Sequence, residues 1–227
     1  MANTPVLNLT RKRLRTPRAA AVAGILFALL YGTSLILLRL SVPADPTVSG
    51  STWMENNGEI VTLALNLIPY SGIAFLWFIG VIRDRVGDSE DRLFGTVFLG
   101  SGLLFLALIF VAGALAGGLL SSFSVDPDKT IEYGTYTYSR AVIYQVLNIY
   151  GIRMAGVFMI SLGTIWFRTG LMHRGWTYLT YATALVLLVS IGLSLWVTLV
   201  FPLWVFLVSV YFLIQNLLHP ETEASQN

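Results

Sequence analysis

The chain contains no cysteine, and only 11% of its 227 residues are charged. The absence of cysteine excludes disulfide bonds, thiolate metal sites and a cysteine nucleophile. Soluble domains carry about 25% charged residues, so this composition, with 56% apolar residues, predicts a chain solvated by lipid. The net charge of +2 is small and the basic residues are not gathered on one surface, so nothing indicates nucleic-acid binding.

Histidine and acidic residues are also scarce inside the predicted membrane spans, where catalysis or proton transfer would need them. His173 and His219 fall at predicted helix ends, and Glu59, at the edge of a span, is the one acidic residue within any predicted span. Proton-coupled transporters usually carry Asp, Glu or His inside the membrane. Intramembrane proteases need paired aspartates, a Ser–His pair or zinc ligands. The sequence therefore predicts no enzyme of a familiar class, no metal site and no cofactor.

Six segments have the composition of membrane spans, which need about 20 mostly apolar residues each. We expect a basic tail over residues 1–18, an all-α transmembrane bundle over 19–219 and a second tail over 220–227. The expected spans are 19–40, 59–82, 93–120, 141–167, 176–198 and 202–218.

The last two spans are divided at a proline. No charged residue occurs between Arg174 and Glu221, a stretch too long for one crossing. Pro202 lies near its middle, flanked by Trp196 and Trp204. Tryptophan is enriched at membrane interfaces, and proline suits a turn or the first turn of a helix. We therefore expect a tight hairpin between residues 198 and 202.

The distribution of basic residues predicts the orientation. Five lie in the amino-terminal tail, three in the loop after the second span and two in the loop after the fourth. The opposite side has Arg39, Lys129 and Arg140. Because basic residues favour cytoplasmic loops, we expect both termini in the cytoplasm. With six spans, residues 1–120 and 141–218 would run in opposite directions, as an inverted repeat requires, but the halves show no sequence similarity.

Small residues indicate where helices pack. The third span contains Gly113-Ala-Leu-Ala-Gly117, a GxxxG pattern that lets two backbones approach closely. The partner helix could belong to the same bundle, to a second copy or to another membrane protein. The second span contains Pro69, which removes a backbone donor and predicts a kink.

Arg153 is the strongest candidate for a functional residue inside the predicted membrane spans. It lies about 20 Å along the helix from both Arg140 and Arg168, near the expected midplane, where an arginine costs about 2.5–3.5 kcal/mol on insertion scales. One interpretation is structural, with Arg153 bonded to carbonyls near Pro69 and to neighbouring polar groups. In the other interpretation, Arg153 binds an anionic ligand. The candidate site residues beside it are Asn66, Tyr70, Ser71, Gln145 and Asn148.

A short motif follows the second span. The segment from Gly80 to Gly87, with Asp84 and Arg85 at its centre, resembles the GxxxDRxG core of major facilitator transporters. Acidic residues between 88 and 91 stand where that family has basic ones. The segment also fits an ordinary helix end, with Gly87 as its cap and the arginines near the negative end of the helix dipole.

A wider resemblance covers the first three spans. The segments 75–85, 91–92 and 96–102 resemble uncharacterised small multi-spanning membrane proteins of bacteria. That group has no assigned activity, so the resemblance implies a bacterial plasma (inner) membrane and no mechanism. Three functions remain open: a non-enzymatic protein that packs against lipids, partners or copies of itself, a small permease that uses Arg153, and an unrecognised membrane enzyme.

Overall fold

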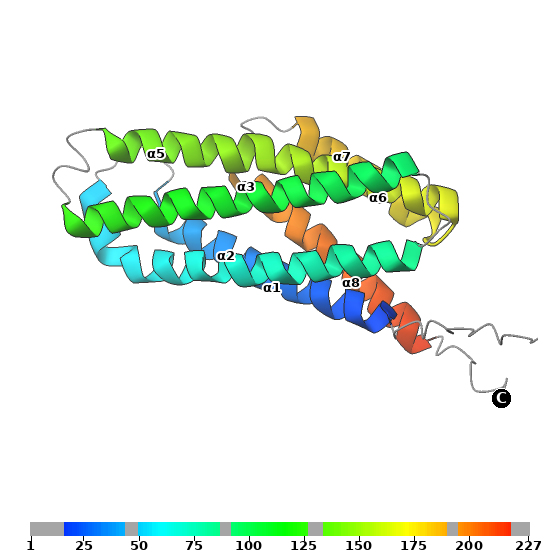
Figure 1. Ribbon diagram of the computed structural model, residues 1–227. Helices are drawn as coiled ribbons and strands as arrows, with labels where there is room; N and C mark the ends of the chain where they lie inside the picture. The colour runs from blue at the N-terminus through cyan, green and yellow to red at the C-terminus, as the bar shows by residue number, and fades with distance from the viewer. Residues whose placement is uncertain (1–15, 44–49, 87–91, 127–133, 190–194, 219–227) are drawn as a thin grey trace, which may run out of the picture.

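The protein is entirely helical over the residues that the computed structural model describes, 16–43, 50–86, 92–126, 134–189 and 195–218 (Figure 1). The helices are α1 (Thr16–Ser41), α2 (Gly50–Val86), α3 (Arg92–Val125), α5 (Thr135–Tyr144), η2 (Gln145–Gly151), α6 (Ile152–Thr169), α7 (Arg174–Val189), η3 (Leu195–Leu199) and α8 (Val200–Leu218). The π-helix η2 joins α5 and α6 into one continuous helix, and the 3₁₀-helix η3 leads into α8. The all-α prediction is confirmed. The predicted tails lie outside the described residues, except that α1 begins at Thr16.

Five helices are long and apolar enough to cross a membrane. They cover Ala19–Ser41, Asn56–Asp84, Leu93–Val125, Thr135–Thr169 and Trp196–Gln215. The remaining helix, α7, has 16 described residues, which corresponds to about 24 Å against a hydrocarbon core of about 30 Å. α7 is the helix that corresponds to the predicted span 176–198.

The segment expected to form the last hairpin is helical. Residues 198 and 199 end η3, and Pro202 is the third residue of α8. Proline is tolerated there because the first N–H groups of a helix have no intrahelical acceptor to lose. Residues 198–202 are therefore helical and do not form the expected hairpin. Residues 190–194, between α7 and η3, lie outside the described part of the chain.

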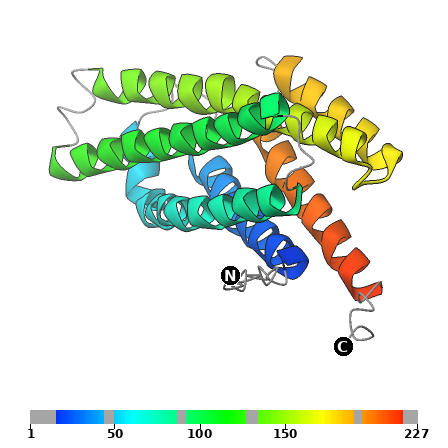
Figure 2. The same ribbon diagram turned by 45° about the vertical axis from the view of Figure 1, so that its right-hand side comes forward.

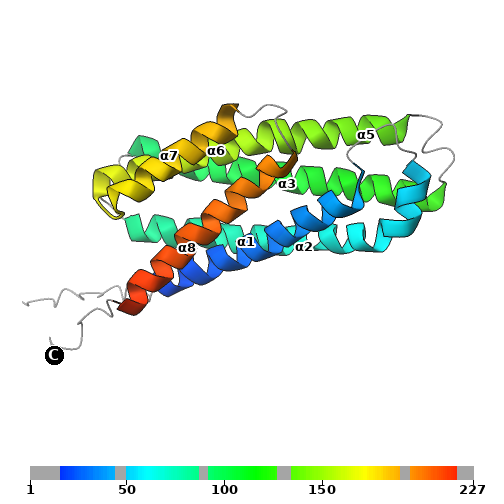
Figure 3. The same cartoon turned by 180° about the vertical axis from the view of Figure 1, so that it is seen from behind.

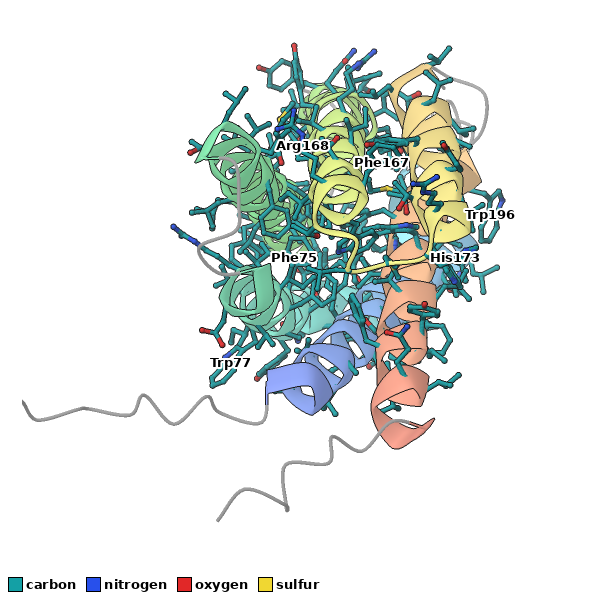
Figure 4. All side chains as sticks on the ribbon, turned by 90° about the vertical axis from the view of Figure 1, so that its right-hand side faces the viewer. Phe75, Trp77, Phe167, Arg168, His173 and Trp196 are labelled. Atoms are coloured by element: carbon teal, nitrogen blue, oxygen red, sulfur yellow. The ribbon has the colours of Figure 1, made fainter. Side chains whose placement is uncertain are left out.

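The helices form two layers of three. α1 packs between α2 and α8, and α6 packs between α3 and α7. Contacts between α2 and α3 join the layers at one side, with α7 and α8 in contact at the other, as the view along the bundle shows (Figure 4). Glycine allows close approach within and between layers: a Cβ on Gly24 would collide with Ser209 of α8, and one on Gly72 with Phe110 of α3.

Phenylalanines fill the centre between the layers. Five of the buried rings come from five different helices, α1, α2, α3, α6 and α8: Phe27, Phe75, Phe105, Phe158 and Phe201. The ring centroids of Phe27 and Phe75 are 4.7 Å apart, as are those of Phe105 and Phe201. Aromatic pairs at this separation contribute about 0.5–1.5 kcal/mol beyond burial of their area. This central aromatic cluster holds five helices together.

The shorter helices α7 and α8 lie toward one end of the bundle. The start of α1 and the end of α8 lie at the same end, here called the tail end (Figure 2). The opposite end, called the far end, contains Ser41 and Thr135. α7 and α8 are short and lie toward the tail end (Figure 3). A Cβ on Gly156 of α6 would lie 3.0 Å from Leu188 near the end of α7, so the described part of α7 stops beside α6 and does not extend along α5.

Candidate functional site

A polar contact crosses between the layers at η2. Arg39, near the end of α1, donates from Nη2 to Asn148 Oδ1 at 3.1 Å. Asn148 in turn donates from Nδ2 to the carbonyl of Tyr144 at 3.2 Å. In a π-helix the backbone bonds run from i to i+5, and such segments are frequent at functional sites. The Asn148 side chain thus bonds both its own widened helix and the arginine of the opposite layer.

Arg39 is held without a carboxylate. It is partly buried, and its Nε is buried without a hydrogen-bond partner. No salt bridge joins it to an acidic side chain among the described residues, so a neutral amide is its acceptor. In the sequence, Arg39 counted only among the basic residues that predict the orientation of the chain. Its place within an apolar run, two residues before the end of α1, was the signal that could have identified it.

Arg140 lies at the far end of the same long helix. It donates from Nη1 to Tyr136 Oη and from Nη2 to the carbonyl of Pro43, each at 2.7 Å. Its guanidinium also lies 5.5 Å from the centroid of the Tyr136 ring, within the range of a cation–π interaction. Tyr136 packs in a small apolar cluster with Phe123 of α3. Arg140 therefore ties the end of α1 to the start of α5.

Arg153 lies on the outward side of its layer. Its Nη1 donates to the carbonyl of Ile149 in η2 at 2.9 Å, an acceptor on its own helix. At about 100° per residue, one face of α6 is only partly buried and the opposite face is fully buried against the other layer. The partly buried face is Arg153, Val157, Ile160 and Thr164. The buried face is Ala155, Met159, Leu162 and Trp166.

The other predicted site residues do not gather around Arg153. Asn66 and Gln145 are exposed, and Tyr70 is 64% exposed. Ser71 is buried and donates to the carbonyl of Ile68 on its own helix at 2.7 Å. Asn148 bonds Arg39 instead. A shared depth on two helices does not imply a shared face, and Arg153 points away from the layer that contains α2.

The predicted GxxxG pattern is divided between two environments. A Cβ on Gly113 would lie 3.3 Å from Ile68 of α2, so this glycine serves packing inside the bundle. A Cβ on Gly117 or on Gly118 would meet nothing within 4 Å. α3 therefore keeps a face of small residues open. Pro69 lies inside α2, which continues through it.

A groove of about 630 Å³ lies between α1 and α2. It is lined mainly by apolar side chains: Ala19, Val22, Ala23, Leu26, Leu30, Tyr70, Ile73, Ala74 and Trp77. No arginine lines it. Trp77 lies at the margin of the bundle on α2 (Figure 4).

The tail end carries separate polar groups. The Arg168 guanidinium lies 4.8 Å from the centroid of the Phe94 ring, and His173 Nδ1 accepts a bond from the backbone N–H of Gly175 at 3.1 Å. In the described part of the chain, no three His, Cys, Asp or Glu residues come together in a group that could hold a metal.

No protein-family model, no curated protein and no solved structure matches this chain.

Proposed function

We propose that this chain is a multi-pass membrane protein with six crossings and both termini in the cytoplasm, and that it acts by packing against another membrane protein rather than by catalysis. The five apolar helices support membrane embedding. The excess of basic residues in the tail and in the loops at the tail end supports the orientation. A bacterial plasma membrane follows from the sequence resemblance alone.

The open face of α3 is the observation that carries this proposal. Only 28% of the most apolar stretch of α3 is buried within the bundle, against 39% to 50% for the other four apolar helices. Exposed residues spaced three or four apart form one stripe along the helix: Ala107, Val111, Ala114, Gly118 and Ser122. In lipid, such small side chains let a second helix approach closely, and packing then drives association.

The interior gives less support to transport or catalysis. The central aromatic cluster fills the space where the layers meet. The groove between α1 and α2 is apolar and does not reach Arg153. Arg39, Arg140 and Arg153 bond to carbonyls, an amide and a phenol. These features favour a protein whose working surface is on its outside.

Site-specific photocrosslinking in membranes tests the proposal. A photoreactive side chain in place of Ala114 should give a protein adduct of defined mass, because this position faces the partner helix. The same side chain in place of Ala182, an exposed position on α7, serves as the matched control and should give lipid adducts only. The mass of the adduct distinguishes a second copy of the chain from another protein. Lipid adducts alone at position 114 would contradict the proposal.

A further inference from the structure

The partner's chemistry can be inferred from Arg153, if the proposed membrane packing holds. The guanidinium has five N–H donors and makes one hydrogen bond within the described residues, to a carbonyl of its own helix. The face of α6 around it otherwise presents the partly buried Val157, Ile160 and Thr164, and the Thr164 hydroxyl is hydrogen-bonded to Tyr181 of α7 at 2.9 Å. Ionisable residues within membrane spans normally face protein or water and have a partner. Within the described residues, Arg153 thus has a single neutral acceptor, and no carboxylate pairs with its charge.

A second copy of this chain could not supply a carboxylate at that depth. Glu59 and Asp84 lie near the two ends of Asn56–Asp84, the apolar stretch of α2, and the other four apolar helices contain no acidic residue. The sequence from Tyr133 to Pro220 also contains none. An acidic group opposite Arg153 must therefore come from a different molecule.

A lipid phosphate fits the position less well. Arg153 lies about 20 Å along the helix from Arg140 and from Arg168. From the middle of a core about 30 Å thick, the headgroups are about 15 Å away, and the three methylenes of an arginine stem cover only part of that distance. The side chain also turns back to the carbonyl of Ile149, four residues earlier on its own helix.

We propose that the outward face of α6 docks a transmembrane helix of another protein, and that this helix carries an Asp or Glu opposite Arg153. The open stripe of α3 lies on the neighbouring helix of the same layer, so a partner on this side could use both features. A charge-assisted hydrogen bond between guanidinium and carboxylate then satisfies both groups away from water.

Reconstitution with designed peptides tests this proposal. The full chain, labelled on a single cysteine introduced at the exposed Thr137, is placed in phosphatidylcholine vesicles. Synthetic leucine–alanine helices with Asp, Asn or Leu at the centre carry the acceptor dye, and energy transfer reports binding. We expect the Asp peptide to bind about tenfold more tightly than the Leu peptide. Arg153→Leu should abolish this difference, whereas Arg168→Leu, a matched change at the tail end, should preserve it.

A charge-reversal variant distinguishes a lost interaction from a misfolded protein. Arg153→Glu should prefer a peptide with a central Lys over the Asp peptide, a gain that a damaged fold cannot produce. Equal binding of the three peptides to the wild-type chain, or an Asp preference that survives Arg153→Leu, would overturn the proposal. So would retention of phosphatidylglycerol that depends on Arg153 together with no peptide preference, because the acceptor would then be a lipid. The photocrosslink at Ala114 reports packing independently of these outcomes.

Discussion

At the scale of single residues, Arg39 shows how a cation can be held between helices by a neutral acceptor. Its Nη2 bonds to the Asn148 amide, and its buried Nε has no acceptor. A buried polar group left without its partner costs the desolvation free energy of that group. Replacing an interacting polar pair with apolar side chains of similar volume can instead be neutral. The two residues should therefore respond unequally to substitution.

A double-mutant cycle measures this asymmetry. Asn148→Leu leaves the guanidinium without its acceptor and should lower the free energy of unfolding by about 1–3 kcal/mol. Arg39→Met removes the cation and should cost less. The double variant should be closer to Arg39→Met than to Asn148→Leu. Denaturation in mixed micelles, followed by the fluorescence of the six tryptophans, gives the four values. A larger loss in Arg39→Met than in Asn148→Leu would contradict the assignment.

At the scale of elements, the long helix Thr135–Thr169 is continuous because η2 joins its two α-helical parts, α5 and α6. Asn148 and Arg153 both donate to carbonyls in or next to η2. Sequence patterns predicted a helix here but not its π-helical segment, since an i to i+5 turn leaves no mark in an apolar run. The partners of Asn148 and Arg153 therefore could not be predicted from position along an ideal α-helix.

Deleting one residue from η2 should be tolerated. A π-turn holds one residue more than an α-turn, so deletion of Val146 lets an α-turn join the same flanking helices. Deletion of Val157 in α6 should prevent folding, because it rotates every residue on one side by about 100° and removes Phe158 or Trp166 from the core. Circular dichroism and size-exclusion chromatography in detergent compare the two. A folded Val157 deletion beside an unfolded Val146 deletion would show that η2 is not a local insertion.

At the scale of the whole molecule, the two halves of the chain make equivalent contacts. α1 packs against the helix that follows it, α2, and against the last helix, α8. α6 packs likewise against the helix that follows it, α7, and against α3, the last helix of the first half. The third helix of the first half, α3, thus lies in the layer of α6 and α7. The third helix of the second half, α8, lies in the layer of α1 and α2. The sequence predicts the six helical segments but shows no repeat, because equivalent contacts need only apolar and small side chains, which leave no specific sequence similarity.

The central aromatic cluster explains another limit of prediction. Its phenylalanines come from five helices that lie far apart in the chain. Composition and spacing locate each ring on an apolar segment but do not determine which helices meet. The same limit applies to the candidate site: Asn148 was predicted as a site residue, but its partner proved to be Arg39, because the layer arrangement decides which faces meet.

The number of crossings can be determined with single cysteines, because the native chain has none. Three exposed positions are suitable: Thr137 at the start of α5, Gly175 at the start of α7 and Trp196 in η3. If α7 and α8 both cross the membrane, cysteines at 137 and 196 should react with an impermeant maleimide added outside intact cells, and a cysteine at 175 only after permeabilisation. If α7 is too short to cross, the residue at 196 should not react from outside while the one at 137 still does. The second result would replace six crossings with four and leave α7 and α8 as a hairpin that enters from the cytoplasmic side.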